Sequence, residues 1–266
     1  MQLTMLGTGN AAVTRCYNTC FVLRDGENNF LVDGGGGNGL LRQLELADID
    51  WRTLRTIFVT HRHIDHIMGV AWMMRKLCQA MCQGDISGDA VIYAHQELVG
   101  LLHQMAQILL AKKHAAMIGP RLHIVPVEDG ETLDILGRPT TFFDIHSNKD
   151  QQFGFSMELE PGKKLTCCGD EPCHAQSEDY ARGSSWLLHE AFCLHSQADV
   201  FKPYEKHHST VKDACELAQR LEVENLLLYH TEDKNLDRRK ELYLAEGREY
   251  FRGNLYVPDD LETLTL

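Results

Sequence analysis

Thr60-His61-Arg62-His63-Ile64-Asp65-His66-Ile67-Met68-Gly69 directly follows the apolar run Thr56-Ile57-Phe58-Val59. The run is typical of a buried strand, so the polar stretch is expected to form a loop at its end. Within six residues the loop offers three imidazoles and one carboxylate, ligands that suit zinc or a similar divalent ion. A solvated polar turn explains a lone histidine better than it explains this density. His61 and His63 can point to one side while Asp65 and His66 leave at another angle, so one loop can serve two metals.

Composition and charge limit the classes of partner. The chain has 266 residues, 44% hydrophobic and 24% charged, and we expect a single domain over residues 1–266. It begins in a strand-like segment, and no apolar run approaches the roughly 18 residues of a spanning helix, so a cytoplasmic protein is expected. The net charge of −12, without a long basic run, disfavours bulk tRNA or DNA binding and disfavours a membrane surface further.

Apolar runs between turn residues predict strands at residues 3–9, 19–23, 29–33, 56–59, 90–94, 121–127, 131–136, 140–145, 152–159, 164–168, 186–191 and 225–229. Helical periodicity predicts helices at residues 40–46, 70–81, 97–117, 210–221 and 236–251. Ser209 is the expected cap of the fourth helix. Strands followed by helices in both halves indicate two sheets with helices on their outer faces, which is an α/β fold of the four-layer αββα sandwich type.

More candidate ligands follow the expected strands. His146, Asp170 and His230 each fall just after a predicted strand, as the histidine-rich loop does. Loops at strand ends on one edge of a sandwich converge, so the set could hold two metals about 3.5–4 Å apart. The seven candidate ligands are His61, His63, Asp65, His66, His146, Asp170 and His230. Cys167, Cys168 and Cys173 lie near Asp170, but the nine cysteines lack the spacing of a disulfide framework and are expected to be buried or free thiols.

Four further motifs follow the histidine-rich loop, and their order is characteristic. After the H-x-H-x-D-H loop come Gly169-Asp170-Glu171-Pro172-Cys173, Leu187-Leu188-His189-Glu190-Ala191-Phe192, His208-Ser209-Thr210 and Leu226-Leu227-Leu228-Tyr229-His230. This ordered set resembles the ribonuclease Z branch of the metallo-β-lactamase superfamily, and the tail at residues 245–251 and 259–262 continues the likeness. The resemblance implies a metallo-β-lactamase-like sandwich with two zinc ions, manganese or iron being alternatives. It implies that His61, His63 and His146 bind one ion, that Asp65, His66 and His230 bind the other, and that Asp170 bridges them.

The resemblance also implies catalytic roles for Asp65, His208 and Glu190. Two zinc ions lower the pKa of a bridging water, so that hydroxide exists at neutral pH. His208, hydrogen-bonded to the Glu190 carboxylate, would then give a proton to the departing oxygen. His174 and the other unassigned histidines, His189 and His195, are expected to be structural.

Three departures from that branch bear on the substrate. Asp33 is followed by four glycines where the branch has D-C-G-E-G-T. Only a short hairpin separates His146 from Asp170, where the tRNA-binding enzymes insert a long arm. After His230, the branch's H-F-S-x-R-Y is replaced by Thr231-Glu232-Asp233-Lys234, which is expected to place acids at the rim. No strong grip on tRNA is therefore expected.

The sequence thus predicts a binuclear zinc-dependent phosphodiesterase that uses a metal-bridging hydroxide on a small phosphodiester or a short nucleic-acid end. One alternative is a tRNA 3′-end processing endoribonuclease, which the missing arm and the charge oppose. Another is a non-phosphate metallo-hydrolase, such as a lactonase, thioesterase or lactamase. The pair of His208 and Glu190 opposes a non-phosphate hydrolase, because an acid helps most when an alkoxide leaves, as it does from a phosphodiester. A metal sensor without turnover is a fourth reading, and a homodimer is left open beside a monomer.

Overall fold

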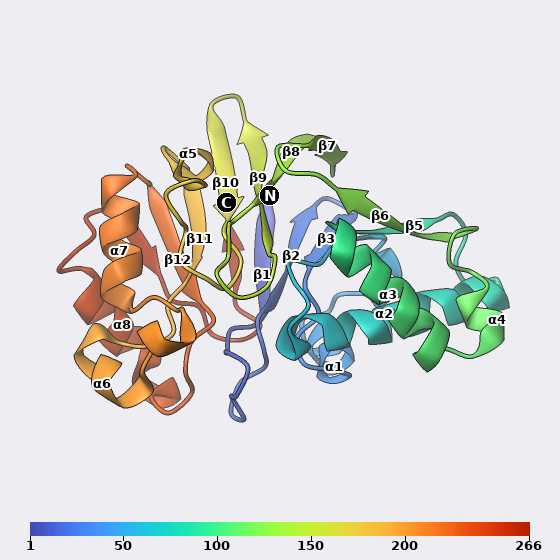
Figure 1. Ribbon diagram of the computed structural model, residues 1–266, viewed down its shortest axis with the longest axis horizontal. Helices are drawn as coiled ribbons and strands as arrows, with labels where there is room; N and C mark the ends of the chain where they lie inside the picture. The colour runs from blue at the N-terminus through green and yellow to red at the C-terminus, as the bar shows by residue number, and fades with distance from the viewer. The chain divides into compact units, whose positions relative to one another are not determined.

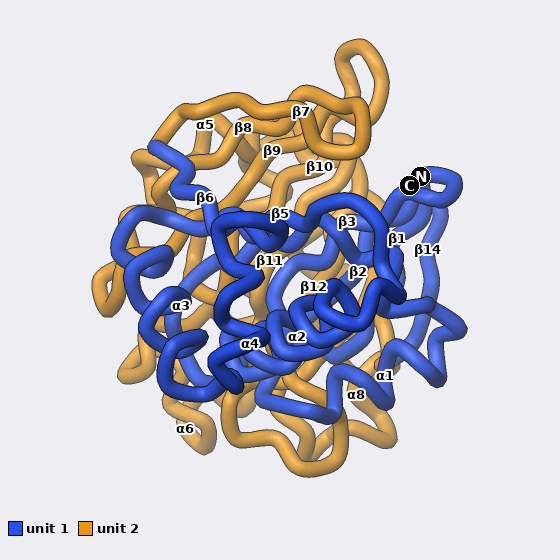
Figure 2. The backbone as a smooth tube through the Cα atoms, turned by 90° about the vertical axis from the view of Figure 1, so that its right-hand side faces the viewer, with its two compact units in different colours: residues 1–7, 19–128, 261–266 blue, residues 8–18, 129–260 orange.

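The computed structural model describes residues 1–266, which divide into two compact units (Figure 2). Unit 1 comprises Met1–Gly7, Thr19–Glu128 and Leu261–Leu266, and unit 2 comprises Thr8–Asn18 and Asp129–Asp260. That residues 1–266 form one domain stays a prediction. None of the helices combines the length and the apolar composition that crossing a bilayer requires.

Unit 1 is built on a seven-stranded sheet in the order β14-β1-β2-β3-β4-β5-β6 (Figure 1). Its strands are β1 (Gln2–Gly7), β2 (Cys20–Asp25), β3 (Asn28–Val32), β4 (Thr56–Phe58), β5 (Ala90–His95), β6 (Leu122–Val127) and β14 (Thr263–Thr265). The pairs from β14 to β3 are antiparallel, whereas β3, β4, β5 and β6 run parallel. Side chains from β3 and β4 are therefore delivered to the same edge of this sheet, at the strands' carboxyl ends.

Helices cover this sheet and set the direction of the candidate ligands. α1 (Gly39–Leu46) contacts β1, α3 (Gln96–Leu109) contacts β5 and β6, and α2 (Ile64–Gln83) contacts α3; a 3-10 turn, η1 (Trp51–Thr53), precedes β4. The prediction that α2 begins at residue 70 was wrong. The polar first turn looks like a loop in the sequence, but Asp65 favours a helix start because a carboxylate stabilises the amino end of a helix. Asp65 and His66 thus stand on a helix.

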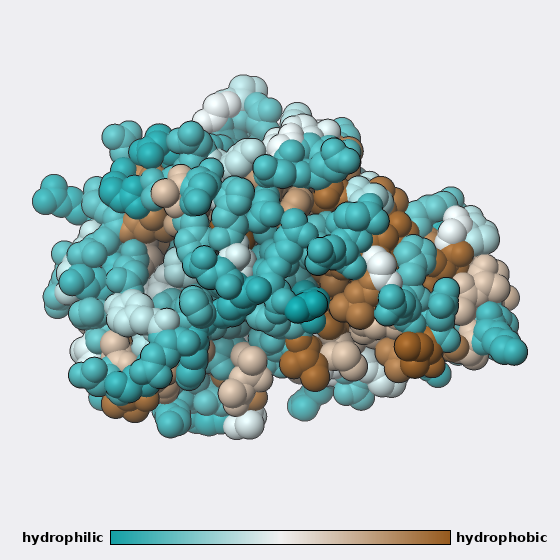
Figure 3. Space-filling model, viewed as in Figure 1, coloured by the Kyte–Doolittle hydropathy of each residue, from teal (hydrophilic) through white to brown (hydrophobic).

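The predicted helix over residues 97–117 was wrong, since the structure has α3 followed by a short α4 (Lys112–Ala115). The last turn of α3 buries little: Ile108 is 79% exposed and Leu109 is 56% exposed. Figure 3 shows hydrophobic residues at the surface over this helix. Because no buried face stabilises its continuation, the helix ends, and the redirected chain buries His114 on α4.

Unit 2 holds the second seven-stranded sheet, in the order β13-β12-β11-β10-β9-β8-β7. Its strands are β7 (Thr132–Ile135), β8 (Arg138–Asp144), β9 (Phe153–Glu160), β10 (Lys163–Cys167), β11 (Trp186–Glu190), β12 (Asn225–Tyr229) and β13 (Asn254–Tyr256). Strands β10 to β13 run parallel, and β7 to β10 are antiparallel. The predicted short hairpin between His146 and Asp170 is confirmed as β9 and β10.

Helices α7 (Val211–Arg220) and α8 (Arg239–Gly247) contact each other and the parallel strands of unit 2. The cap of α7 is Thr210 and not the predicted Ser209. Thr210 and Asp213 form a reciprocal capping box, while the Ser209 amide donates to Glu190 instead. The helix predicted at 236–251 is shorter in the structure, because a 3-10 turn precedes α8 and α8 ends at Gly247. The remaining short segments are α5 (Glu178–Ala181), α6 (Ala198–Phe201), η2 (His195–Gln197), η3 (Tyr204–Lys206) and η4 (Leu236–Arg238).

Candidate metal centre

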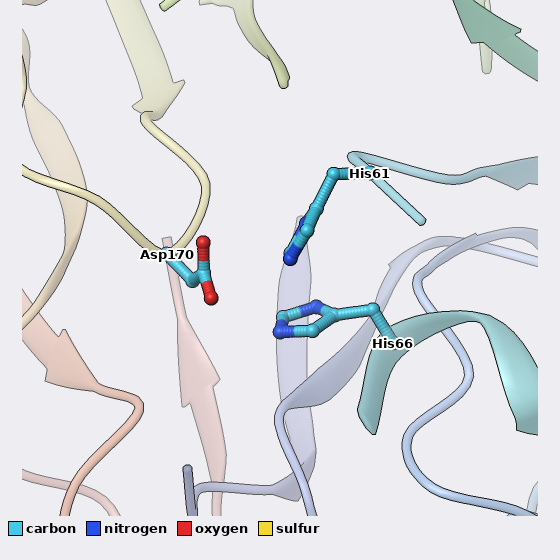
Figure 4. Close-up of side chains that lie close together, drawn as sticks. All are labelled: His61, His66 and Asp170. Atoms are coloured by element: carbon cyan, nitrogen blue, oxygen red, sulfur yellow. The ribbon is translucent and has the colours of Figure 1, made fainter. Parts of the chain in front are cut away.

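In unit 1 the histidines after β4 converge (Figure 4). His61 is fully buried, and its Nε2 lies 2.8 Å from Nδ1 of His63. A tetrahedral zinc ion with bonds of about 2.0–2.1 Å would hold two ring nitrogens about 3.3 Å apart. The two rings therefore already present their nitrogens toward one point at nearly the spacing that a shared ion requires.

The first turn of α2 adds two more donors. The His66 ring centroid lies 4.1 Å from that of His61, and Nε2 of His66 lies 3.4 Å from a carboxylate oxygen of Asp65. Asp65 and His66 are both buried. Burial lowers the pKa of His66, but the carboxylates of Asp65 and Asp33 outweigh burial and hold that pKa well above its usual range. The structure thus brings all four predicted ligands of the motif together in unit 1.

Asp33, which the sequence did not assign to the site, organises these rings. It follows β3 directly, and its carboxylate accepts hydrogen bonds from the Thr60 amide at 2.8 Å, the Thr60 hydroxyl at 2.8 Å and Nδ1 of His66 at 2.7 Å. The Thr60 hydroxyl donates its only proton to Asp33, so at 2.9 Å from Nδ1 of His61 it must accept. Both histidines are thereby protonated at Nδ1, which leaves Nε2 as the metal-binding atom.

A close backbone contact holds α2 against the loop that carries Asp33. The Gly34 amide donates to the His66 carbonyl at 2.8 Å, and the Gly69 amide donates to the Gly35 carbonyl at 2.9 Å. A Cβ on Gly69 would lie 1.8 Å from the Gly34 oxygen. Glycine is required at this crossing, so part of the glycine run after Asp33 serves the placement of the ligands on α2.

In unit 2 the candidate residues end neighbouring parallel strands. Asp170 follows β10 (Figure 4), Glu190 ends β11 and His230 follows β12. Nε2 of His230 lies 3.5 Å from the Asp170 carboxylate, and both side chains are buried. His230 has a φ of 58°, a left-handed conformation that turns its side chain out of the strand direction. Parallel register therefore explains why residues far apart in sequence meet here.

His208 joins this group, with one difference from the expectation. Its ligand atom lies within 4.8 Å of those of Asp170 and His230, and its ring stacks on Phe192. The predicted hydrogen bond to Glu190 is not formed, because Nδ1 lies 3.6 Å from the Glu190 carboxylate, beyond hydrogen-bond range. Burial, followed by the charge of His230, lowers the pKa of His208 to about 3. Burial raises the pKa of Glu190 well above its usual range, so burial favours the neutral form of both groups.

His146 is the predicted ligand that the structure does not gather with the others of unit 2. It is exposed, takes a φ of 58°, and its amide donates to Asp144 at 2.7 Å. Asp170, His208 and His230 form their group without it. It stands at the carboxyl end of β8, at the start of the connection to β9.

His189 has the structural role that was expected, and its position makes that role specific. Its Nδ1 donates to the Glu190 carbonyl at 2.7 Å, and its Nε2 accepts from the Cys173 amide at 3.1 Å. Burial lowers the pKa of His189 to about 4, so the ring is neutral and ties the end of β11 to the loop that carries Asp170. The cysteines take no part in a metal group, and all nine are free thiols.

The types of donor atom in these residues suit a divalent transition metal. Imidazole nitrogens and carboxylates are the ligands of zinc sites, and each ligating histidine is expected to have its other nitrogen held by a second group. Asp33 and Thr60 provide that second group for His66 and His61. Acidic residues beside the histidines also compensate the charge of an ion. His66 is expected to release its Nε2 proton on metal binding, because only a nitrogen with a free electron pair can coordinate the ion.

Known proteins are similar to this chain over nearly its whole length. Ribonuclease Z of Synechococcus sp. strain CC9902 is 25% identical over 312 aligned positions, covering 98% of this chain and 91% of the relative. That span exceeds 266 residues, so the relative carries segments that this chain lacks. The metallo-β-lactamase fold protein YhfI of Bacillus subtilis superposes with a TM-score of 0.79 at 15% identity, covering 99% of this chain and 98% of YhfI. The short form of human tRNase Z gives 0.75 at 20% identity, covering 100% and 99%.

These relatives confirm the predicted resemblance, the α/β metallo-β-lactamase fold and the assignment to the metal-dependent hydrolases. The family described as anti-Pycsar protein Apyc1 matches residues 1–248, and this chain belongs to that family.

Proposed function

We propose that the chain is a binuclear zinc phosphodiesterase acting on a small phosphodiester or a short nucleic-acid end. The observation that carries the proposal is the ring arrangement of unit 1, where Asp33 and Thr60 hold Nδ1 of His66 and of His61, so that Nε2 is the atom of each ring that would bind an ion. The proposed ligands are His61, His63, Asp65, His66, His146, Asp170 and His230. Curated relatives named ribonuclease Z support cleavage of phosphodiester bonds.

Two bound zinc ions would supply a hydroxide at neutral pH and would neutralise charge on the phosphoryl group. The protein supplies the proton for the leaving oxygen. Glu190 holds this proton on Oε2, because its Oε1 already accepts from the Ser209 amide. The separation of 3.6 Å between Oε2 of Glu190 and Nδ1 of His208 has to shorten for the carboxyl proton to pass to Nδ1, and the ring would then give the proton on its other nitrogen to the departing oxygen. The net transfer leaves Glu190 ionised and His208 neutral, so only Glu190 takes on a charge, and the Ser209 amide stabilises that carboxylate.

The rim of unit 2 requires a correction to the expected repulsion of phosphates. Glu232 is only 3% exposed, and its carboxylate accepts from the amides of Lys234 and Asn235. Asp233 accepts from the amides of Thr14 and Arg15. Both carboxylates are thus bound to backbone amides, which partly compensate their charge and weaken the repulsion that was expected from them. The preference for small substrates therefore rests on the short hairpin between His146 and Asp170.

Cleavage of precursor tRNA is the second candidate, favoured by the names of the curated relatives. A direct comparison separates the two: metal-loaded protein is assayed on a small diester, on cyclic nucleotides and on precursor tRNA at matched concentrations. We expect turnover of small diesters and at most weak tRNA cleavage with a shallow dependence on salt. Efficient cleavage at one tRNA position with a steep salt slope would replace the proposal by its competitor.

A lactam and a lactone belong in the same assay, since a fold does not fix its substrate. Hydrolysis of these alone would favour a non-phosphate hydrolase, and no turnover on any substrate would favour a sensor. A cytoplasmic location and a homodimer stay predictions. Light scattering of the purified chain measures the second.

A further inference from the structure

The connection from β8 to β9 is anchored on one buried carboxylate. Glu171 is fully buried and directly follows Asp170. The Ser147 hydroxyl donates to its Oε1 at 2.9 Å, and the Asn148 amide lies 3.3 Å from its Oε2. The side-chain Nε2 of Gln152 lies 3.5 Å from Oε1. The connection is thus fixed against the loop that carries Asp170.

Lys149 is held at the same carboxylate. Its ammonium lies 3.6 Å from Oε1 of Glu171, and its side chain is 23% exposed, so it reaches solvent. Because Glu171 directly follows the proposed ligand Asp170, a positive charge stands close to the proposed metal centre of unit 2 in a chain whose net charge is −12.

We propose that Lys149 binds a non-bridging phosphate oxygen of the substrate and rests on Glu171 when no substrate is bound. The inference rests on the proposed function and adds a phosphate subsite to it. An ammonium on a flexible four-carbon stem suits this task, because it can move between two anions as a point charge. Glu171 keeps the donors of Ser147 and Asn148 when Lys149 leaves, so the move does not strand a bare buried carboxylate.

The competing explanation is that Lys149 only balances the charge of Glu171. Buried ion pairs are common for structural reasons, and removing one partner alone is destabilising. The two roles make different demands. As a counterion, Lys149 is needed only while Glu171 is charged, whereas as a phosphate-binding residue it is needed whether or not Glu171 is charged.

Binding of inorganic phosphate to the zinc-loaded protein, measured by calorimetry, tests the subsite without turnover. Lys149→Met should weaken phosphate binding about 10- to 100-fold, the loss expected for a hydrogen bond to a charged group. Lys149→Arg keeps the charge and should bind within a few fold of wild type. Lys163→Met is the matched control, since it removes an exposed lysine, paired with Glu160 at 3.0 Å, at the opposite end of β10 from Asp170. It should leave binding unchanged.

A double-mutant cycle decides between the roles. In a Glu171→Gln background the amide can still accept from Ser147 or Asn148, but no charge needs balancing. If Lys149 binds phosphate, Lys149→Met should weaken binding by a similar factor in this background. Disappearance of the effect would overturn the subsite, as would wild-type phosphate affinity in Lys149→Met. Phosphate binding that depends on Lys149, without turnover of any diester, would uphold the subsite and refute the proposed function.

Discussion

Asp33→Asn should weaken zinc binding while leaving the fold intact, because it reverses the direction of two hydrogen bonds. Asparagine tolerates the φ of 58° at this position. Its oxygen must still accept from the Thr60 amide, so its NH₂ group takes the place of the oxygen that now accepts from His66. An NH₂ can only donate, so His66 has to carry its proton on Nε2. The amide also donates to the Thr60 hydroxyl, which then donates to His61 and imposes the same change there.

The expected loss follows from what zinc requires. A ligating histidine needs a free electron pair on Nε2, and loss of the group that orients such a ring costs about 10- to 100-fold in metal affinity. That factor corresponds to about 1.4–2.7 kcal/mol. Stability without metal should change by only about 1 kcal/mol, because the hydrogen bonds are reversed and not lost.

The assay is calorimetric titration of zinc into chelator-stripped protein, with circular dichroism as the check on folding. Asp50→Asn is the matched control: that carboxylate accepts from the Arg52 amide at 3.0 Å in an exposed turn of unit 1, and its side chain is 43% exposed. The control should bind zinc as wild type does. A folded Asp33→Asn protein with wild-type zinc affinity would refute the account of how Asp33 sets the two rings.

Three further outcomes are expected. His208→Ala should lower turnover about 10²- to 10⁴-fold on a diester with a poor leaving group, with metal content unchanged, and less with nitrophenolate; equal losses on both would rule out the acid role. Gly69→Ala should destabilise unit 1 by about 3 kcal/mol or more in urea unfolding, since its Cβ would meet the Gly34 oxygen at 1.8 Å. The pKa of His189 is lowered to about 4 on folding, so the unfolded chain binds the extra proton between about pH 4 and 6.5, and stability should rise with pH across that window by up to about 3 kcal/mol. Urea midpoints at pH 5 and 7 measure this, and an equal slope in His189→Gln would contradict it.

The sequence predicted the two sheets well because apolar runs such as Leu226-Leu227-Leu228 end at recognisable polar residues. It did not locate the start of α2, because metal-binding side chains in a first helical turn look like a loop. The break after α3 was missed for another reason. Apolar periodicity continued through Ile108 and Leu109, and only tertiary packing shows that these residues find no buried partner.

The residues of the candidate site were likewise predictable only in part. Residues with ligand chemistry could be found from their types and their place after strands. Asp33 could not be assigned, since its role depends on hydrogen bonds to Thr60 and His66 that only the fold creates. The signal was present, because an acid directly after β3 reaches the edge where β4 ends. The orientation of Glu232 was equally invisible, because sequence cannot show whether a loop acid faces solvent or its own backbone amides.

We expect two bound metal ions to make this chain a phosphodiesterase. Titrating zinc into chelator-stripped protein while measuring hydrolysis of bis(p-nitrophenyl) phosphate tests this expectation. We expect no turnover without metal and a rise that reaches its plateau at two zinc ions per chain. A plateau at one ion per chain, or no hydrolysis at any zinc ratio, would contradict it.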